Sequence, residues 1–162
     1  MIGAHVAPTV EAMTGALRQE EHLLRELAAV LRGQRTAIAD DDLERLDDAV
    51  FGTHRVLLTL GEARRRRQTL NQMLGEADDL SMQALRDAFG GTPPTSVQAA
   101  IDALIEAGEQ LHREVDLNQR VLRIAIDAGD QLVRALCGAP SANTYGGDGT
   151  PPLLAPMLDR RI

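Results

Sequence analysis

The sequence predicts an all-α fold, in which three long helices and one short helix form an elongated antiparallel bundle with coiled-coil-like packing and a flexible C-terminal tail. Aromatic residues make up only 2 % of the 162 residues, whereas the cores of β-sandwiches and β-barrels rely on aromatic and β-branched side chains. Apolar residues also recur at alternating steps of four and three over three long stretches, which is typical of packed helices.

The first helix is expected from about Thr9 to Ala39. Gly33 weakens this stretch by about 1 kcal/mol relative to alanine and so allows a kink there. One stripe keeps the four-three spacing throughout, with two polar interruptions, and we expect it to face the other helices. Its members are Met13, Leu17, Glu20, Leu24, Leu27, Leu31, Gln34 and Ile38.

The acidic stretch ADDDLERL separates the first helix from the second. Asp41 is predicted as the N-cap, with Glu44 completing a capping box, and the second helix runs from about Leu43 to Leu74. Four consecutive arginines, residues 64–67, point all round a helix, so we expect them to be solvated. The predicted inward stripe comprises Leu43, Leu46, Val50, Leu57, Leu60 and Leu74, interrupted by Thr53, Arg64, Arg67 and Asn71.

A short helix is predicted within LSMQALRDAFGG, with Ser81 near its start and Gly90 past its end. The loop GGTPPT leads to the longest pattern, from Ser96 to Cys137, capped by Thr95 or Ser96. Cys137 is expected to be buried. The predicted stripe, in which the two glycines allow close helix approach and Asn118 fixes the register, comprises Val97, Ile101, Leu104, Gly108, Leu111, Val115, Asn118, Leu122, Ala125, Gly129, Leu132 and Leu136.

We expect a helical bundle domain over residues 1–137 and a Pro/Gly-rich tail over residues 138–162. The third long helix spans roughly 63 Å, against roughly 47 Å for each of the others, at 1.5 Å per residue. Its apolar end should therefore lie beyond the cover of its neighbours. The short helix, the tail or another protein is expected to cover it.

Composition excludes several functions. The formal net charge is −7, which argues against nucleic acid as the ligand. No apolar run approaches the ~20 residues that span a membrane, so direct membrane insertion is not expected. The single cysteine and the absence of a signal-peptide pattern indicate a cytoplasmic protein.

Two histidine patterns suggest alternative functions. Glu109 and His112 have the spacing of di-iron ligands, but the second such pair that a di-iron site needs is missing. His22 resembles a phosphotransfer histidine, although Glu26 occupies the position of the usual glycine and would repel a phosphoryl group. A signalling or metal-binding bundle, or a generic coiled-coil scaffold, is therefore the alternative to the function below. No metal or cofactor is expected.

The order of features resembles the flagellar export chaperones of the FlgN type. The similarity rests on AIADDDLERLDDAV after the first helix, LLTLGEARRRRQTLNQML in the second, LNQRVLRIAIDAGDQLVRAL in the last, and the closing NTYGGDGT. It extends over roughly residues 10–150. The first nine residues and PPLLAPMLDRRI lie outside it.

This resemblance implies a cytosolic chaperone and not an enzyme. Such chaperones bind the terminal amphipathic segment of hook-filament junction (hook-associated) proteins, keep these clients soluble and deliver them to the membrane export gate of the flagellar type III apparatus. The resemblance places client binding late in the last helix, on Leu117, Val121, Leu122, Ile124, Leu132, Val133 and Leu136.

Tyr145, followed by Gly146, is the only tyrosine in the chain. The resemblance implies that this pair docks on the export gate. The alternative is that Tyr145 folds back onto the end of the last helix. The sequence leaves open which junction protein is the client and whether the chain forms a homodimer.

Overall fold

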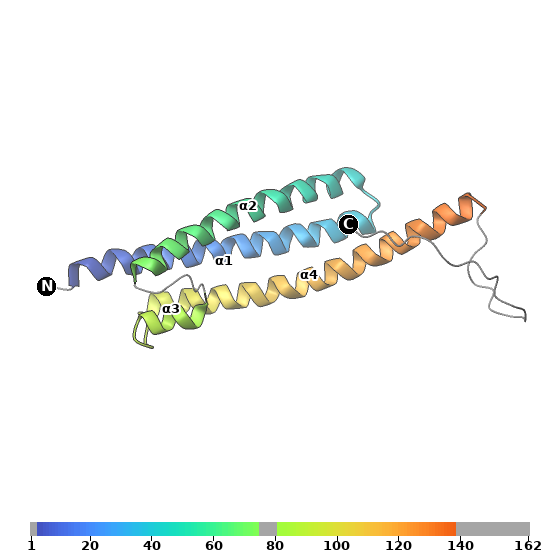
Figure 1. Cartoon of the computed structure of the whole chain (residues 1–162). Coiled ribbons are helices and arrows are strands. Elements are labelled where there is room, and N and C mark those ends of the chain that lie inside the picture. Colours follow the sequence, from blue (N-terminus) through green and yellow to red (C-terminus); the bar gives the residue numbers. More distant parts are fainter. Residues whose placement is uncertain (1–2, 75–80, 139–162) are drawn as a thin grey trace, which may run out of the picture. The chain divides into compact units, whose positions relative to one another are not determined.

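The structure, a computed structural model, describes residues 3–74 and 81–138, with side chains from Val10 onward. Its described elements are all helices, which confirms the predicted fold class (Figure 1). The chain divides into two compact units, Met1–Ile126 and Asp127–Ile162. The predicted domain boundary after residue 137 stays a prediction, because nearly all of the predicted tail lies outside the described residues. The helices are α1 (Gly3–Ala39), α2 (Leu43–Met73), α3 (Met82–Ala88) and α4 (Thr95–Leu136).

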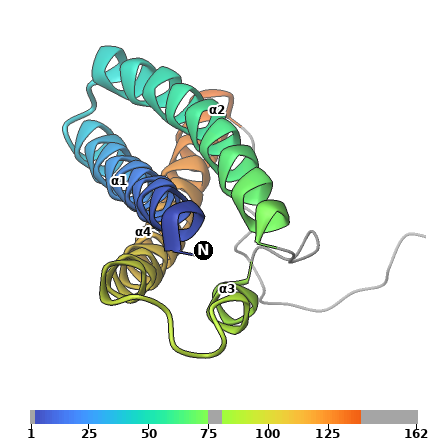
Figure 2. The same cartoon turned by 90° about the vertical axis from the view of Figure 1, so that its left-hand side faces the viewer.

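Helix α1 lies between α2 and α4 (Figures 1 and 2). Its polar contacts give the directions of its neighbours. Glu20 pairs with Arg67 near the end of α2, whereas Gln34 bonds Thr53 nearer the start, so α1 and α2 are antiparallel. In contrast, Arg25 pairs with Glu106 and Arg35 with Glu114, so α1 and α4 run in the same direction. The predicted up-down-up order is therefore confirmed.

The core forms where the predicted stripe of α1 meets its neighbours. Every position of that stripe is buried except Ile38, which is half-buried. The burial of these leucines supplies the main stabilising free energy, at about 25 cal/mol per Å² of apolar surface. Four residues of the stripe, Met13, Leu17, Leu24 and Leu27, pack in one cluster with Val56, Leu60 and Ala63 of α2, Leu85 of α3, and Val97, Ala100, Ile101, Leu104 and Ala107 of α4.

The predicted inward stripe of α2 is confirmed in its second half and wrong in its first. Leu60, Arg67 and Asn71 of that stripe are buried, together with Val56 and Ala63, whereas Leu43, Val50 and Leu57 are exposed. The first half of α2 approaches α1 through small residues: an added Cβ at Gly52 would lie 3.6 Å from Val30 of α1. The first part of the predicted stripe, from Leu43 to Leu57, therefore lies beside the contact with α1 and not in it.

The prediction of a solvated arginine segment is wrong for Arg67. This side chain is buried, and its Nε and Nη2 donate to the two carboxylate oxygens of buried Glu20 at 2.6 and 3.2 Å. Arg64, Arg65 and Arg66 are exposed, as expected. Because four consecutive residues point in all directions around a helix, one of them faces α1.

A buried polar layer joins the three long helices. The Nδ2 of Asn118 donates to Oε1 of Gln34 at 2.8 Å, and Nε2 of Gln34 donates to Oγ1 of Thr53 at 3.2 Å. These bonds can form only when all three helices are in this register. The predicted inward position of Asn118 is thus confirmed, and the polar interruption at Gln34 is explained.

The turn between α1 and α2 differs by one residue from the prediction. Asp42, in extended conformation, is the N-cap of α2 and accepts from the backbone N–H of Arg45 at 3.0 Å. Asp41 has a positive φ of 54°, which aspartate tolerates better than most residues, and it completes the turn instead of capping the helix. Glu44 is therefore too close to the cap to form the predicted capping box.

Two further expectations for α4 are wrong. Nothing lies within 4 Å of a Cβ added at Gly108 or Gly129, so neither glycine permits a close helix approach among the described residues. Cys137 is exposed instead of buried, as is every described residue from Leu122 onward. The predicted bounds of α4 differ from the observed ones by a residue at each end.

Helix α3 packs against the start of α4. Ser81 is its N-cap and accepts from the backbone N–H of Ala84 at 3.1 Å. Leu85 is buried in the core, and Arg86 lies 3.3 Å from Asp102 of α4. Because α3 lies beside the first turns of α4, it does not provide the cover that was considered for the far end of that helix.

Candidate functional site

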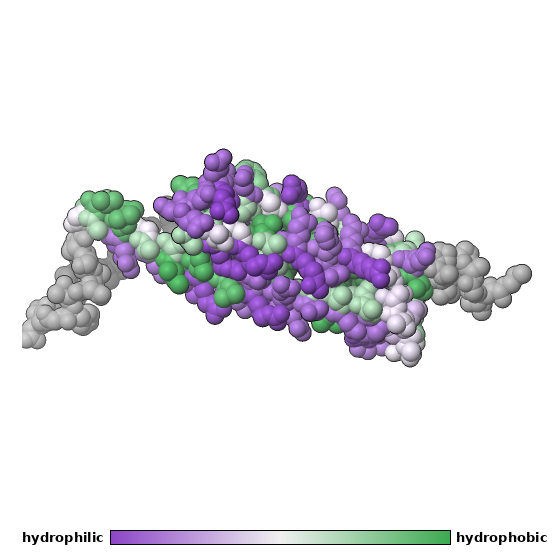
Figure 3. All heavy atoms as spheres, turned by 180° about the vertical axis from the view of Figure 1, so that it is seen from behind, coloured by the Kyte–Doolittle hydropathy of each residue, from purple (hydrophilic) through white to green (hydrophobic). Residues whose placement is uncertain are grey.

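The second half of α4 exposes apolar side chains. Asn118 is the last buried residue of the helix, Val121 is half-buried, and every residue from Leu122 to Gly138 is exposed. Figure 3 shows hydrophobic residues at the surface toward the end of this helix. Within the described part of the chain, six of the seven predicted client residues are exposed. The exposed ones are Leu117, Leu122, Ile124, Leu132, Val133 and Leu136.

These residues do not form a single surface. Leu117 and Ile124 are seven residues apart and share one face of α4. Leu122 lies roughly half a turn away from both, at 100° per residue, and shares its face with Ile126. Leu132, Val133 and Leu136 follow on the same helix within the second compact unit, where they too are exposed.

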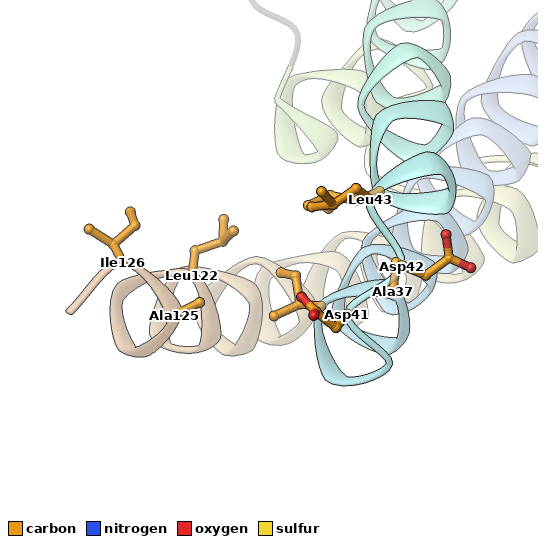
Figure 4. A pocket seen from close by; sticks show the side chains of 9 residues that line it. Ala37, Asp41, Asp42, Leu43, Leu122, Ala125 and Ile126 are labelled. Atoms are coloured by element: carbon orange, nitrogen blue, oxygen red, sulfur yellow. The ribbon is translucent and has the colours of Figure 1, made fainter. Parts of the chain in front are cut away.

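A cavity of about 340 Å³ lies where the exposed part of α4 meets the turn between α1 and α2 (Figure 4). Of the predicted client residues, only Leu122 lines this cavity. The sequence does not predict the other lining residues as part of the site, although Leu43 and Leu46 begin an apolar stripe next to the place where α1 ends. The cavity is lined by Ala37, Ile38, Asp41, Asp42, Leu43, Leu46, Leu122, Ala125 and Ile126.

Ionic contacts hold α4 against the end of α1 just before this cavity. Glu114 accepts from Nη1 of Arg32 at 3.0 Å and also pairs with Arg35. The hydrogen bond from Arg35, followed by that from Arg32, lowers the pKa of Glu114 below its ordinary value. Both bonds favour the ionised carboxylate, and together they fix the helix from which Leu122 projects.

The geometry gives no support to the metal alternative, and the exposure of His22 does not test the phosphotransfer alternative. Glu109 and His112 are exposed, and His112 lies 3.7 Å from Asp116. His22 is an exposed side chain on α1. Within residues 3–74 and 81–138, no group of three or more histidine, cysteine or acidic residues is placed to hold a metal ion.

Two other expectations concern the tail and the membrane. Tyr145 and Gly146 lie outside the described residues. Among the helices that are described, none combines the length and apolar character that a bilayer crossing needs.

The chain matches the FlgN protein family over residues 1–152. It belongs to the FlgN family. Neither a curated protein nor a solved structure matches it. The match includes the first nine residues, which the resemblance had excluded, and it ends at Pro152. FlgN proteins are cytoplasmic flagellar chaperones for hook-associated proteins, and they are not enzymes.

Proposed function

We propose that this FlgN chain binds the terminal amphipathic segment of its hook-associated client along the second half of α4. The observation that carries the proposal is the exposure of apolar side chains from Leu117 to Leu136. These side chains lie on more than one face of α4, so the client segment contacts several apolar patches, and exposed apolar patches mark interaction sites on proteins. The proposed contacts are Leu117, Val121, Leu122, Ile124, Leu132, Val133 and Leu136.

Binding of this kind shields the client by mass action. An amphipathic segment that places its apolar face on a complementary helix surface removes that face from water. The same contact lowers the concentration of the free, aggregation-prone segment. Because the client must later be released for export, we expect a moderate affinity.

The proposal is tested by calorimetric titration of a full-length hook-associated protein and of the same protein without its terminal segment. We expect heat of binding only with the full-length client. Leu122→Asp combined with Leu132→Asp should weaken binding at least tenfold, because each buried leucine contributes about 1.5–3 kcal/mol. Gln131→Asp, an exposed polar position on the same helix, is the control. Equal binding of both client forms would end the proposal.

We further propose that Tyr145 and Gly146 carry the loaded chaperone to the export gate. A tyrosine ring combines apolar area with a hydroxyl group and is a common anchor in interfaces. Tyr145→Ala should leave client affinity unchanged and weaken binding to the gate protein, measured by co-sedimentation with gate-containing membranes. Loss of client binding would instead favour the alternative in which Tyr145 covers α4.

Homodimer formation through the same apolar surface is the competing proposal. Sedimentation equilibrium of the wild-type chain and of Leu122→Asp distinguishes the two. A wild-type monomer supports a surface kept for clients, whereas a dimer that Leu122→Asp dissociates supports self-association.

A further inference from the structure

Helix α3 occupies a fourth helix position beside α1, α2 and α4, but only at one end. A second cavity there is lined by residues of all four helices, including Arg64 of α2, Met82 of α3 and Leu104 of α4. Figure 2 shows α3 beside the end of α2 and the start of α4. With seven residues, α3 is about 10 Å long at 1.5 Å per residue. It therefore covers only a small part of the space between α2 and α4.

The part of α2 that α3 does not cover carries an apolar stripe outside the core. Leu43, Val50 and Leu57 are seven residues apart in sequence and so share one face of the helix. Their exposed fractions are 75, 52 and 48 %. Leu46 lies on the same side and is half-buried. We call Leu43, Leu46, Val50 and Leu57 the α2 stripe.

The opposite edge of the contact between α1 and α2 has a different character. A shallow depression there is lined by Arg45, Asp48 and Arg55, together with small residues and Val30 of α1. One edge of α2 is thus charged and the other is apolar over the same turns. A helix that met only water on both edges would not need this asymmetry.

The apolar edge faces α4. Leu43 and Leu46 line the 340 Å³ cavity together with Leu122, Ala125 and Ile126 of α4. In Figure 4, Leu43 on α2 and Leu122 and Ile126 on α4 border the same open space. Two members of the α2 stripe, Leu43 and Leu46, and this part of α4 therefore form two apolar walls of the cavity. Val50 and Leu57 extend the first wall along the same face of α2.

Charge decides between the occupants of this position. Residues 40–48 contain six acidic residues and one arginine, and that arginine, Arg45, is paired with Asp40 and Asp42. A helix with basic residues beside its apolar face is attracted to this acidic segment, whereas an acidic or uncharged helix is not.

We propose that the client helix completes the bundle: its apolar face lies between the α2 stripe and Leu122, Ala125 and Ile126, and arginine or lysine residues at its edge meet Asp41 and Asp42. This proposal rests on the proposed function and adds a second wall to the site. The short helix α3, whose Leu85 is buried in the core, is the intramolecular precedent for a further amphipathic helix that packs on the three long ones.

The first test measures client affinity for paired variants of α2. Leu43→Asp combined with Val50→Asp is expected to weaken binding at least tenfold. The matched control is Phe51→Asp combined with Leu58→Asp, which changes equally exposed residues (68 and 61 %) on the outer face of α2 and should alter the affinity less than twofold. Circular dichroism melting verifies that both variants fold. Equal effects of the two pairs would overturn the proposal.

The second test identifies the occupant directly. A photo-crosslinking amino acid at position 50 should join the client's terminal segment, and mass spectrometry should place the link on its apolar face. The same group at position 51 is the control and should give no such product. A link from position 50 to a second copy, or to residues 139–162 of the same chain, would assign the position to that occupant and overturn the proposal.

The two proposals fail in different ways. If the wild-type chain binds full-length and truncated client with equal affinity, the proposed function is wrong. If Leu122→Asp weakens client binding but the pair at Leu43 and Val50 does not, the α4 surface stands and only the second wall is lost. A client segment whose basic residues are changed to glutamate should also bind more weakly, and unchanged affinity would contradict the charge argument.

Discussion

At the scale of single residues, the ion pair between Glu20 and Arg67 places two charged side chains in the core. Removal of two charges from water costs several kcal/mol for each ion, and mutual attraction offsets this cost only while both partners are present. Arg67→Ala leaves the Glu20 carboxylate buried without its guanidinium. We expect the free energy of unfolding, measured by urea denaturation, to fall by roughly 3–5 kcal/mol.

Two controls separate the pair from general effects of an arginine. Arg66→Ala changes an exposed neighbour and should alter stability by less than about 0.5 kcal/mol. Glu20→Leu combined with Arg67→Leu replaces both charges by apolar groups and should recover most of the loss. An Arg67→Ala protein as stable as the wild type would show that Arg67 does not stabilise the buried Glu20 carboxylate.

Glu114 makes the free energy of unfolding depend on pH in the acidic range. Its pKa is lowered in the folded state by the bonds from Arg35 and Arg32, so its ionised form stabilises the fold. This contribution is fully present above the unfolded pKa of about 4.3 and is lost as the pH falls through the lower folded pKa. Glu114→Gln should therefore reduce stability near neutral pH, and its difference from the wild type should shrink toward acid.

Urea denaturation at a series of pH values measures this difference. Glu109→Gln, at an exposed position one and a half turns earlier on α4, is the control and should show little difference at any pH. A gap between wild type and Glu114→Gln that stays constant down to strongly acidic pH would contradict the assignment.

The polar residues of the core show how far single positions can be interpreted from sequence. The spacing predicts Glu20 and Arg67 each as a polar interruption of an apolar stripe, but spacing within one helix does not join them. Their opposite charges, on two helices predicted to be antiparallel, are the signal that pairs them. Asn118 could be placed in the core because its stripe is long and regular.

At the scale of the helix, α4 consists of a packed half and an exposed half. Local opening costs least where few side chains are buried. Backbone amides of residues 122–136 should therefore exchange with deuterium faster than those of residues 97–118, and a bound client should slow the exchange of the second group. Equal exchange in both halves without client would contradict the exposure of the second half.

The first half of α2 shows why its inward face was mispredicted. It carries apolar residues on more than one face, and the four-three spacing predicts the face with Leu43, Val50 and Leu57 as the one that packs. Periodicity identifies an amphipathic helix but does not tell which apolar stripe meets a neighbour. The small residue Gly52, which allows α2 to approach Val30, indicates the side that packs.

At the scale of the molecule, the helix order and directions followed from helix lengths and short connections, which leave few arrangements. The exposed residues of α4 followed from the mismatch in length. The cavity did not, because Leu43 and Leu122 are far apart in sequence and no pattern within one helix shows which surface it will adjoin. The packing of the helices brings these two residues to one cavity, and the periodicity of the sequence does not show how the helices pack.

The position of Cys137 has a practical consequence. This residue is the only cysteine of the chain and is exposed just after α4 ends at Leu136. A maleimide dye would attach at this one site without mutagenesis and would report on events near the proposed client surface. In air, two such thiols can oxidise to a covalent link between chains, so any measurement of molecular mass needs a reducing agent before a dimer is inferred.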